Sequence, residues 1–488
     1  MSAAFVIVGG GIAGVTCAET LSALCSDVKI ILLAASGLIK TVVNFQQVSR
    51  TLESFQVEER PKTSLEEHCP NVEVVEKIVL SLNSEKNKII CSDGSEVVYK
   101  KLCICTGGRP KLIPGNNERV LGIRDVQSVV EFQKMLSNAK RLLVVGNGGI
   151  ATELVHEIQG CEVIWAIKDS YITSTFVDAG AAQFFLPHLN NEKTTENLPS
   201  KRLKYVVDKD AKNSNAPVLG GALGPDWATS HEMSGSEKGP RSVFVEHCVE
   251  VKKVLTPEEF KKSQLKDVTP PGFRTAPPLP QETWPVYVEL TNGTVYGCDF
   301  IVSATGIIPN SEIFLKGNKF DTSTDGYLNV NSRMETSVTD VYAAGDICSA
   351  TWEWAPQWQQ MHLWTQARQM GCYAAKCMAA ALKVEEVQMD FCFELFAHVT
   401  VFFNFKVVLL GKFNAQGLGD DYEMLLRVTI GEEYVKAVLQ DGRLVGAILI
   451  GETNLEETFE NLILNAMDLT PFKEHLLNPN IDIEDFFD

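Results

Sequence analysis

The chain has 488 residues, a formal net charge of −18 and a hydrophobic content of 45%. This length favours about two to four domains. Because the net charge is strongly negative, the protein repels phosphate backbones, and direct binding of nucleic acid is not expected. The apolar runs are far shorter than the ~20 residues of a membrane span, so no membrane association is expected. Because the first strand is predicted to begin within a few residues of Met1, no signal or transit peptide is expected.

The 13 cysteines are odd in number, scattered, and often placed within apolar runs. Their density is well below that of a disulphide-stabilised scaffold. We therefore expect buried, reduced thiols in a reducing compartment. The cytoplasm is the default location, and the nucleus is the alternative.

The N-terminal part predicts a strand–helix–strand unit with a parallel sheet. Short apolar runs rich in β-branched residues predict buried parallel strands at 5–8, 28–33 and 101–105. A helix from Ile12 to Leu24 is expected between the first two strands. Residues 72–80 and 87–99 are expected to form a small antiparallel excursion that turns at Asp93-Gly94.

The order of strand, glycine turn and helix recurs at residues 141–167, with the helix expected from Thr152 to Gln159. A strand within 300–306 is expected to close this second unit. Residues 190–283 are rich in polar residues, Gly and Pro, so most of this interval is interpreted as a partly flexible insertion. The runs Val243–Val254 and Val286–Leu290 are nevertheless predicted to be strands of the domain itself.

From Ala397 onward the pattern changes to hairpins and a helix, which predicts a separate α+β domain. Strands are expected at Lys406–Phe413, Met424–Ile430, Tyr434–Leu439 and Leu444–Ile450, with a turn at Asp441-Gly442 and a helix from Glu456 to Met467. The tail from Ile481 to Asp488 is acidic with interleaved aromatic residues. Disorder and packing as a terminal arm are both compatible with that composition.

A glycine-rich turn follows the first strand and precedes the first helix. Gly9 permits the tight bend, Gly11 lets the backbone approach a pyrophosphate, and Gly14 lets helix and strand pack closely. The helix N-terminus supplies free N–H groups and a positive dipole end for phosphates. The Asp or Glu that normally binds the adenosine ribose is missing, because the next strand ends in Ala34-Ala35-Ser36. Ser36 could make one weaker bond there.

The second turn contains Gly146, Gly148 and Ala151, with Ala an accepted variant at the third position. Two such turns predict two separate dinucleotides, which a flavin enzyme needs if a nicotinamide cofactor reduces it. The strand after this turn leads into Lys168-Asp169. Lys168 could meet a 2′-phosphate, Asp169 could serve NADH, or Lys168 could be a solvated surface charge. The choice between NADH and NADPH stays open.

Further segments complete a family pattern. Cys105-Thr106-Gly107-Gly108, Ala304-Thr305-Gly306 and the run from Val341 to Asp346 accompany the two turns. Together they cover residues 1–385, and over them the chain resembles the pyridine nucleotide-disulphide oxidoreductase superfamily. The resemblance implies an α/β fold of two Rossmann-like dinucleotide-binding domains, one for FAD and one for NAD(P)H, plus a C-terminal α+β domain.

The resemblance also implies domain boundaries. The FAD-binding domain would be discontinuous, at 1–135 and 310–385. The NAD(P)H-binding domain would span 136–309 and contain the insertion, and residues 386–488 would form the C-terminal domain.

The resemblance implies cofactor-binding roles one residue at a time. Gly9, Gly11 and Gly14 would hold the FAD pyrophosphate, Gly146, Gly148 and Ala151 that of NAD(P)H, with Ser36, Lys168 and Gly306 in the same cofactor-binding set. Thr106 and Gly107 would pass close to the flavin. Asp346 would accept hydrogen bonds from the ribityl chain, with a helix N-cap as the alternative. The helix from Leu363 to Ala381 would point its N-terminus at the isoalloxazine, and Trp364 is the expected direct flavin contact.

A Lys–Glu pair near flavin N5 is implied as well, and we predict that it consists of Lys40 and Glu153. A cation there would favour the arrival of hydride. The alternative is that these residues are two independent surface charges.

No redox-active cysteine pair of the superfamily's reductases is found. Residues 37–60 contain no cysteine, and Cys-x-x-Cys occurs nowhere. Cys103 and Cys105 are expected to point into the core, Cys372 and Cys377 fall on different faces of one helix, and His398 is expected to be a packing residue. No metal site is expected.

The leading hypothesis is therefore an FAD-dependent NAD(P)H oxidoreductase that passes electrons to an unidentified acceptor without a protein disulphide. Oxygen, a quinone or a thiol on another protein would each serve. The resemblance adds a role in the response to oxidative stress. The alternative is a flavin- and NAD(P)H-based redox sensor or protective interaction protein with little turnover, and a third is a structural relative without flavin.

Overall fold

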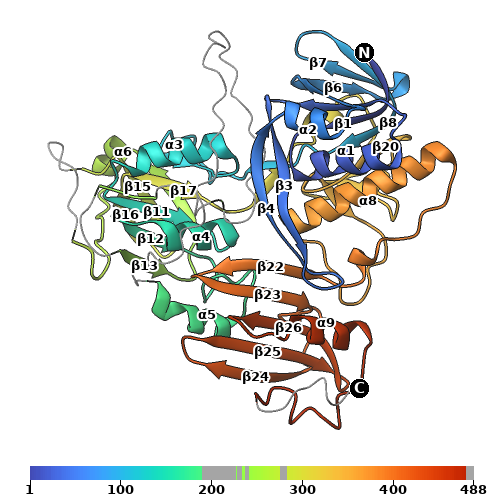
Figure 1. Ribbon diagram of the computed structural model, residues 1–488. Helices are drawn as coiled ribbons and strands as arrows, with labels where there is room; N and C mark the ends of the chain where they lie inside the picture. Colours follow the sequence, from blue (N-terminus) through green and yellow to red (C-terminus); the bar gives the residue numbers. More distant parts are fainter. Residues whose placement is uncertain (190–226, 228–232, 237–240, 275–282, 480–488) are drawn as a thin grey trace.

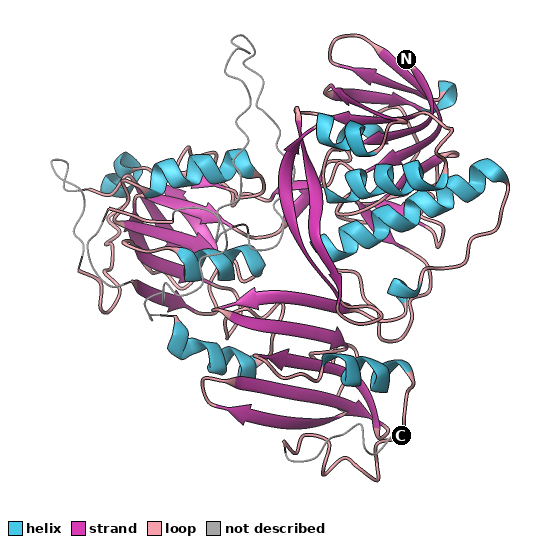
Figure 2. Cartoon of the chain, in the orientation of Figure 1, coloured by secondary structure: helices cyan, strands magenta, loops and turns pink. Residues whose placement is uncertain are grey.

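The computed structural model describes residues 1–189, 227, 233–236, 241–274 and 283–479. Three domains surround a common centre (Figure 1), and each combines a sheet with helices (Figure 2). The first is built on the sheet that contains β1, the second on the sheet that contains β11, and the C-terminal domain on strands β22–β26. The expected flexibility within 190–283 and the nature of the tail 481–488 concern segments that lie largely outside the described residues.

The first domain has a sheet in the order β5-β2-β1-β8-β7-β6, with β20 paired to β8. Its parallel strands are β1 (Ser2–Val8), β2 (Ile30–Ala34), β5 (Val72–Glu76), β8 (Glu96–Ile104) and β20 (Val341–Ala343). Helix α1 (Ile12–Leu24) has its predicted bounds and packs against α8 (Trp364–Lys383). The central strand is buried because helices and strands cover both faces, which explains its continuous apolar run.

The antiparallel excursion is smaller than predicted. Val72–Glu76 pairs in parallel with β2 and therefore belongs to the main sheet, which corrects the prediction for 72–80. The excursion consists of β6 (Val79–Asn83) and β7 (Lys88–Cys91), and β7 pairs antiparallel with the start of β8. The predicted turn at Asp93-Gly94 is confirmed, with Gly94 at a φ of +78°.

A long hairpin of β3 (Leu38–Gln47) and β4 (Glu53–Pro61) was not predicted. It leaves the first domain and reaches the C-terminal domain (Figure 1). At its tip, the backbone N–H groups of Arg50 and Thr51 donate to the buried Glu460 carboxylate at 3.0 and 2.6 Å. Leu52 lies fully buried in the core of the C-terminal domain. The hairpin therefore fastens these two domains together.

The second domain has a parallel sheet in the order β10-β17-β11-β12-β13. Its strands are β10 (Val120–Leu121), β11 (Arg141–Val145), β12 (Glu162–Ala166), β13 (Ser242–Glu246) and β17 (Phe300–Ser303), with helices α3 (Val126–Leu136), α4 (Gly149–Glu157) and α5 (Ala179–Phe185). The predicted repeat of the first unit is confirmed, although α4 begins three residues earlier than Thr152.

A second, antiparallel sheet of this domain consists of β14 (Val251–Leu255), β15 (Val286–Leu290) and β16 (Val295–Cys298), and α6 (Pro257–Lys262) follows β14. The prediction of one strand over Val243–Val254 is corrected, because that run is divided between β13 and β14. The prediction for Val286–Leu290 is confirmed.

The C-terminal domain is a five-stranded antiparallel sheet in the order β22-β23-β26-β25-β24. Its elements are β22 (Ala397–Phe402), β23 (Phe405–Gly411), β24 (Glu423–Thr429), β25 (Glu433–Gln440), β26 (Arg443–Ile450) and α9 (Glu456–Leu464). Asp441 and Gly442 both have positive φ, as the predicted tight turn requires. The Lys436 ammonium, buried in this domain, pairs with Asp178 at the start of α5.

Smaller elements complete the first two domains: α2 (Thr63–His68), β9 (Gly108–Pro110), β18 (Ile307–Pro309), α7 (Glu312–Leu315), β19 (Leu328–Val330) and β21 (Cys348–Ala350). Strands β9 and β18 pair with each other where the chain crosses between the domains. None of the helices in the described part of the chain has the length and apolar character that a membrane span requires.

Candidate functional site

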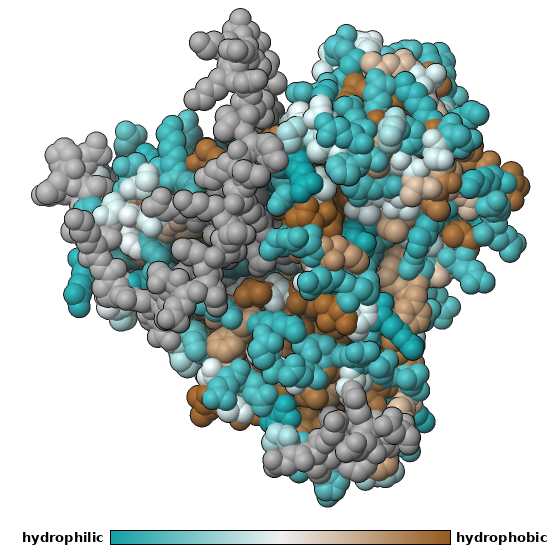
Figure 3. Space-filling view, viewed as in Figure 1, coloured by the Kyte–Doolittle hydropathy of each residue, from teal (hydrophilic) through white to brown (hydrophobic). Residues whose placement is uncertain are grey.

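A cavity of about 1580 Å³ lies between the domains and is lined by both glycine turns. The three domains all contribute to it, with residues such as Gly11 from the first, Gly148 from the second and Thr400 from the third. Hydrophobic side chains gather in the middle of the face drawn in Figure 3, where the domains meet. One continuous space thus connects the two predicted dinucleotide sites.

The first turn has the shape that a bound pyrophosphate needs. Gly9 has a φ of +124°, and a Cβ there would overlap the carbonyl oxygen of Cys105. A Cβ at Gly14 would overlap the carbonyl of Gly9, so helix α1 packs directly on the turn. At Gly11, by contrast, a Cβ would meet no atom within 4 Å. The backbone here is exposed to the cavity, where a phosphate can approach the start of α1.

The second turn repeats this geometry. Gly146 has a φ of +126°, and a Cβ there would overlap the carbonyl oxygen of Ala304. The space beside Gly148 is free to 4 Å, as it is at Gly11. Ala151 is fully buried in the following helix, as the third position of the motif requires.

A polar network that the sequence did not indicate holds the second turn. The Asn147 amide donates to Asp169 at 2.8 Å, to the Tyr171 carbonyl at 2.9 Å and to Ser174 at 2.9 Å. Its oxygen accepts from the backbone N–H of Thr173 at 2.5 Å. The Asp169 carboxylate is thus turned towards the glycine turn, where it also accepts from Ser174.

The two predicted ribose contacts, Ser36 and Lys168, both line the cavity. The Ser36 hydroxyl donates to the carbonyl of Leu38 at 3.1 Å, so it is already part of a local turn. Lys168 is exposed at its rim. Their roles in holding a ribose stay predictions.

Asp346 lies at the end of β20 and takes part in an ion pair that the sequence did not reveal. Arg124 approaches it at 2.8 Å and donates to the carbonyl of Gly108 at 2.8 Å. His362 Nδ1 lies 3.9 Å from the same carboxylate, and the His362 ring stacks on Tyr327 with centroids 4.6 Å apart. Burial lowers the pKa of His362 in spite of the nearby carboxylate, so the ring is neutral at pH 7.

The strand ends between the domains are tied to each other beside the cavity. Thr106 donates to the carbonyl of Asn310 at 3.2 Å, and the Asn310 amide donates back to the carbonyl of Thr106 at 2.9 Å. Gly107 and Gly306 have φ values of +58° and +107°, which glycine tolerates best. Thr106, Gly107 and Gly306 line the cavity, and their roles in cofactor binding stay predictions. The contacts of Asn310 were not predicted.

Trp364 is the first residue of α8 and lines the cavity, and its direct contact with the flavin stays a prediction. No side chain caps this helix, so its free N–H groups face the cavity. The Trp364 ring lies 5.2 Å from the ring of His398, which is buried and bonded to Thr365 at 3.2 Å. The prediction that His398 is a packing residue is confirmed.

The predicted pair of Lys40 and Glu153 is corrected. Lys40 lies on β3 and forms an ion pair of 2.9 Å with Glu59 across the hairpin. Glu153 lines the cavity and accepts a hydrogen bond of 2.6 Å from the indole of Trp227. Sequence reasoning missed both partners, because the hairpin was not predicted and Trp227 belongs to the insertion. The catalytic roles of Lys40 and Glu153 stay predictions.

These observations fit the two predicted cofactors. Each turn offers a backbone cradle at a helix start, which suits a pyrophosphate. The uncapped start of α8 suits the negative charge that a reduced flavin carries. Within the described residues no group of His, Cys, Asp and Glu side chains has the arrangement of a metal site.

Comparisons with known proteins agree with this geometry. The family model for pyridine nucleotide-disulphide oxidoreductases matches residues 3–210 and 268–371, and that for the rubredoxin NAD+ reductase C-terminal domain matches residues 401–467. The rat pyridine nucleotide-disulfide oxidoreductase domain-containing protein 1 is 57% identical, over 99% of this chain and 98% of the rat protein.

Two solved structures share the fold. A putidaredoxin reductase, in covalent complex with putidaredoxin, has a TM-score of 0.62 and 16% identity over 95% of this chain and 93% of its own. An engineered water-forming NADPH oxidase bound to NADPH has a TM-score of 0.64 and 16% identity over 96% and 92%. The chain belongs to the pyridine nucleotide-disulphide oxidoreductase family and is an oxidoreductase that uses FAD and NAD(P)H.

Proposed function

We propose that this oxidoreductase takes hydride from NAD(P)H and passes the electrons to an external acceptor without a disulphide of its own. The observation that carries the proposal is the single cavity lined by both glycine turns. Two dinucleotides bound at these turns would extend into one space, as direct hydride transfer requires. When bound, the flavin supplies the redox chemistry, and the protein supplies position and electrostatics.

The cysteines support the proposal that electrons pass to the acceptor without a disulphide of the protein itself. Cys105 is the cysteine among the cavity-lining residues, and its thiol lies 3.5 Å from that of Cys103. The hydrogen bond with Cys103, together with burial, raises the pKa of Cys105 well above its usual value. A thiol with a raised pKa is a poor nucleophile at pH 7. The hairpin β3–β4 occupies the segment in which the sequence contains no cysteine.

Several residues would hold and orient the cofactors. The backbones at Gly11 and Gly148 would receive the pyrophosphates, and the Asp346 carboxylate, fixed by Arg124, would accept from the ribityl chain. The start of α8 at Trp364 would stabilise negative charge on the reduced ring.

A reductive titration tests this function. Under exclusion of oxygen, about one equivalent of NAD(P)H per flavin should bleach the visible absorbance fully. A redox-active disulphide would raise the requirement to about two equivalents and release thiols that a thiol reagent counts. Either finding would contradict the proposal, as would a protein that stays colourless when FAD is added.

The acceptor is then identified by reoxidation. We add oxygen, a quinone or a disulphide-containing protein to the reduced enzyme and follow the return of absorbance. The family resemblance supports a role in the response to oxidative stress, in the cytoplasm or the nucleus. A long-lived charge-transfer band with negligible reoxidation by all three would replace turnover with the function of a redox sensor.

A further inference from the structure

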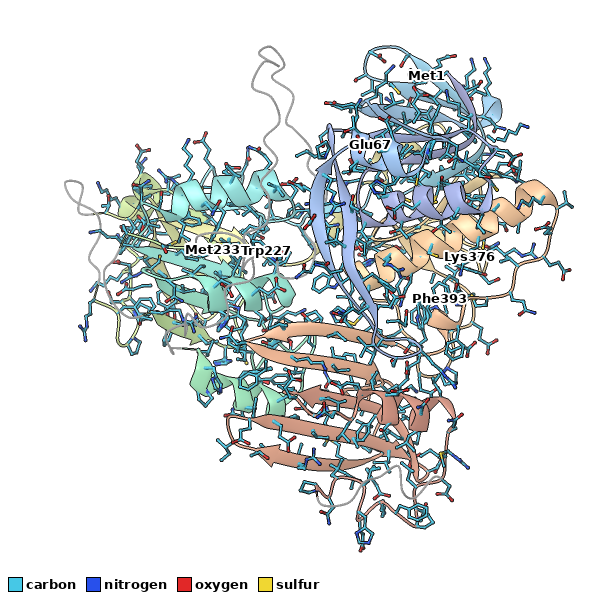
Figure 4. The ribbon with its side chains drawn as sticks, viewed as in Figure 1. Met1, Glu67, Trp227, Met233, Lys376 and Phe393 are labelled. Carbon is cyan, nitrogen blue, oxygen red and sulfur yellow. The ribbon has the colours of Figure 1, made fainter. Side chains whose placement is uncertain are left out.

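We infer that Trp227 is a positioning residue that orients the Glu153 carboxylate for hydride transfer. Trp227 lies within the interval that sequence analysis interpreted as an insertion, far along the chain from the glycine turn. Its side chain is nevertheless only 4% exposed and lines the cavity shared by both turns. Figure 4 labels it in the second domain. The inference rests on the proposed function.

The contact between the two side chains is direct. The indole Nε1 donates a hydrogen bond of 2.6 Å to Glu153 Oε2. An indole can only donate, and a carboxylate is the acceptor with which it bonds most strongly. The bond therefore selects one orientation of a side chain that otherwise has three rotatable torsions. Glu153 lines the same cavity, one helical turn from the start of α4.

The indole itself is held by packing. It belongs to an apolar cluster that includes Ala151 of α4, Phe176 and Phe402. Phe176 and Phe402 line the cavity as well, with ring centroids 5.2 Å apart. A large ring in such a cluster has few alternative positions, so its N–H points in a fixed direction. Trp227 thus contributes a hydrogen-bond donor of fixed direction to the wall of the cavity.

This arrangement makes the N–H group, rather than the ring surface, the important feature of Trp227. A carboxylate that is held in one orientation beside the reacting groups lowers the cost of reaching the transition state. A purely structural tryptophan would affect folding and cofactor content. A tryptophan that stacked on the nicotinamide would affect the affinity for NAD(P)H.

The test is Trp227→Phe, which retains an aromatic ring and removes the donor. Anaerobic stopped-flow reduction over a series of NAD(P)H concentrations yields the limiting rate and the apparent Kd separately. We expect the limiting rate to fall about tenfold, while the apparent Kd stays within about twofold and the FAD content is unchanged. Trp284→Phe is the matched control, because Trp284 is equally buried but lies outside the cavity.

A double-mutant cycle connects the effect to Glu153. Glu153→Gln should slow reduction, and Trp227→Phe should add no further loss in that background. The inference is overturned if Trp227→Phe reduces at the wild-type rate, changes only the apparent Kd, or multiplies the loss of Glu153→Gln. A wild-type protein that NAD(P)H does not bleach would refute the proposed function itself, which is a separate outcome.

Discussion

The two glycine turns share a backbone but are held in different ways. Gly9 and Gly146 have nearly the same φ, +124° and +126°, and each backs onto the carbonyl of a neighbouring strand end. The first turn continues with Gly10, whose surroundings are the side chains of Ala34 and Ile39. The second continues with Asn147, whose amide makes hydrogen bonds to Asp169, Ser174 and the following loop.

The difference shows that one dinucleotide motif can be stabilised by apolar packing or by a polar network. Packing around the first turn leaves no carboxylate at the ribose position, where the strand ends at Ser36. The network around the second turn uses the Asp169 carboxylate for structure. At both sites we therefore predict that recognition of the adenosine ribose depends on residues other than the usual acid.

The largest expected effect on the two glycine turns comes from adding one methyl group to each of them. Gly9→Ala should yield a colourless protein, and Gly146→Ala should retain FAD but lose flavin reduction by NAD(P)H by about a hundredfold. In both variants the Cβ would overlap a carbonyl at a strained φ. Visible absorbance and stopped-flow reduction measure the two effects.

Gly317→Ala serves as the control for this pair. Gly317 also has a positive φ, +80°, but no atom lies near its Cβ position. That variant should retain both functions. If Gly146→Ala loses flavin while Gly9→Ala retains it, the assignment of the two turns is reversed.

Disrupting the polar network around the second turn is expected to have a smaller effect than the glycine substitutions. Asn147→Ala leaves the Thr173 N–H without the Asn147 oxygen and removes one of the donors to the Asp169 carboxylate. We expect a loss of about 1–3 kcal/mol in the stability of the second domain, together with weaker NAD(P)H binding and normal FAD content. Thermal unfolding and NAD(P)H titration measure this. Asn138→Ala on the surface should change neither, and an unchanged Asn147→Ala would show that packing alone holds the turn.

The burial of His398 predicts that the stability of the protein depends on pH. Burial lowers the pKa of His398 to about 3, so the folded protein leaves it neutral while the unfolded chain protonates it below about pH 6.5. The unfolded state then binds more protons, and stability falls as the pH falls. Between pH 7.5 and 5.5 this costs about 1.4 kcal/mol.

Denaturant unfolding at these two pH values tests the effect of His398. His398→Gln should reduce the difference by about 1.4 kcal/mol, whereas the exposed His68→Gln should leave it in place. An equal loss of stability in His398→Gln and the wild type would show that other groups cause the pH dependence.

The smallest expected effect concerns the choice of nicotinamide cofactor. Because Asp169 is engaged in the network, Lys168 is the residue at this strand end that remains exposed at the cavity rim. Lys168→Ala should lower kcat/KM for NADPH about fivefold and leave that for NADH unchanged, as expected for one exposed charge pair. Lys168→Arg should retain the preference. Equal changes for both cofactors would remove Lys168 from ribose recognition.

Sequence reasoning located the turns because local chemistry determines them. A buried strand, three small residues and a helix lie within about 20 residues of each other, and α1 has its predicted bounds. The hairpin of the C-terminal domain was predicted for the same reason, since Asp441-Gly442 marks its turn. The hairpin β3–β4 has no such turn signal, because its tip contains Ser49, Arg50 and Thr51.

Contacts between residues that are far apart along the chain could not be predicted from the sequence. Lys40 pairs with Glu59 only because the unpredicted hairpin places them on neighbouring strands. Arg124 reaches Asp346 across more than 200 positions, which no spacing rule indicates. Trp227 stands in a polar, glycine-rich context whose composition predicted an insertion, and only the folded arrangement places it beside Glu153.

Through the contact at Glu460, the C-terminal domain supports the predicted FAD site, although that site is formed by residues far away along the chain. Leu38, at the base of the β3–β4 hairpin, lines the cavity, and Val42 and Phe55 cluster with Trp364. The far end of the same hairpin is embedded in the C-terminal core at Leu52. A truncation after residue 385 would therefore leave that end without its binding site and loosen one wall of the flavin site. Loss of yellow colour in a fragment that ends at residue 385 would therefore show that FAD binding needs the docked C-terminal domain.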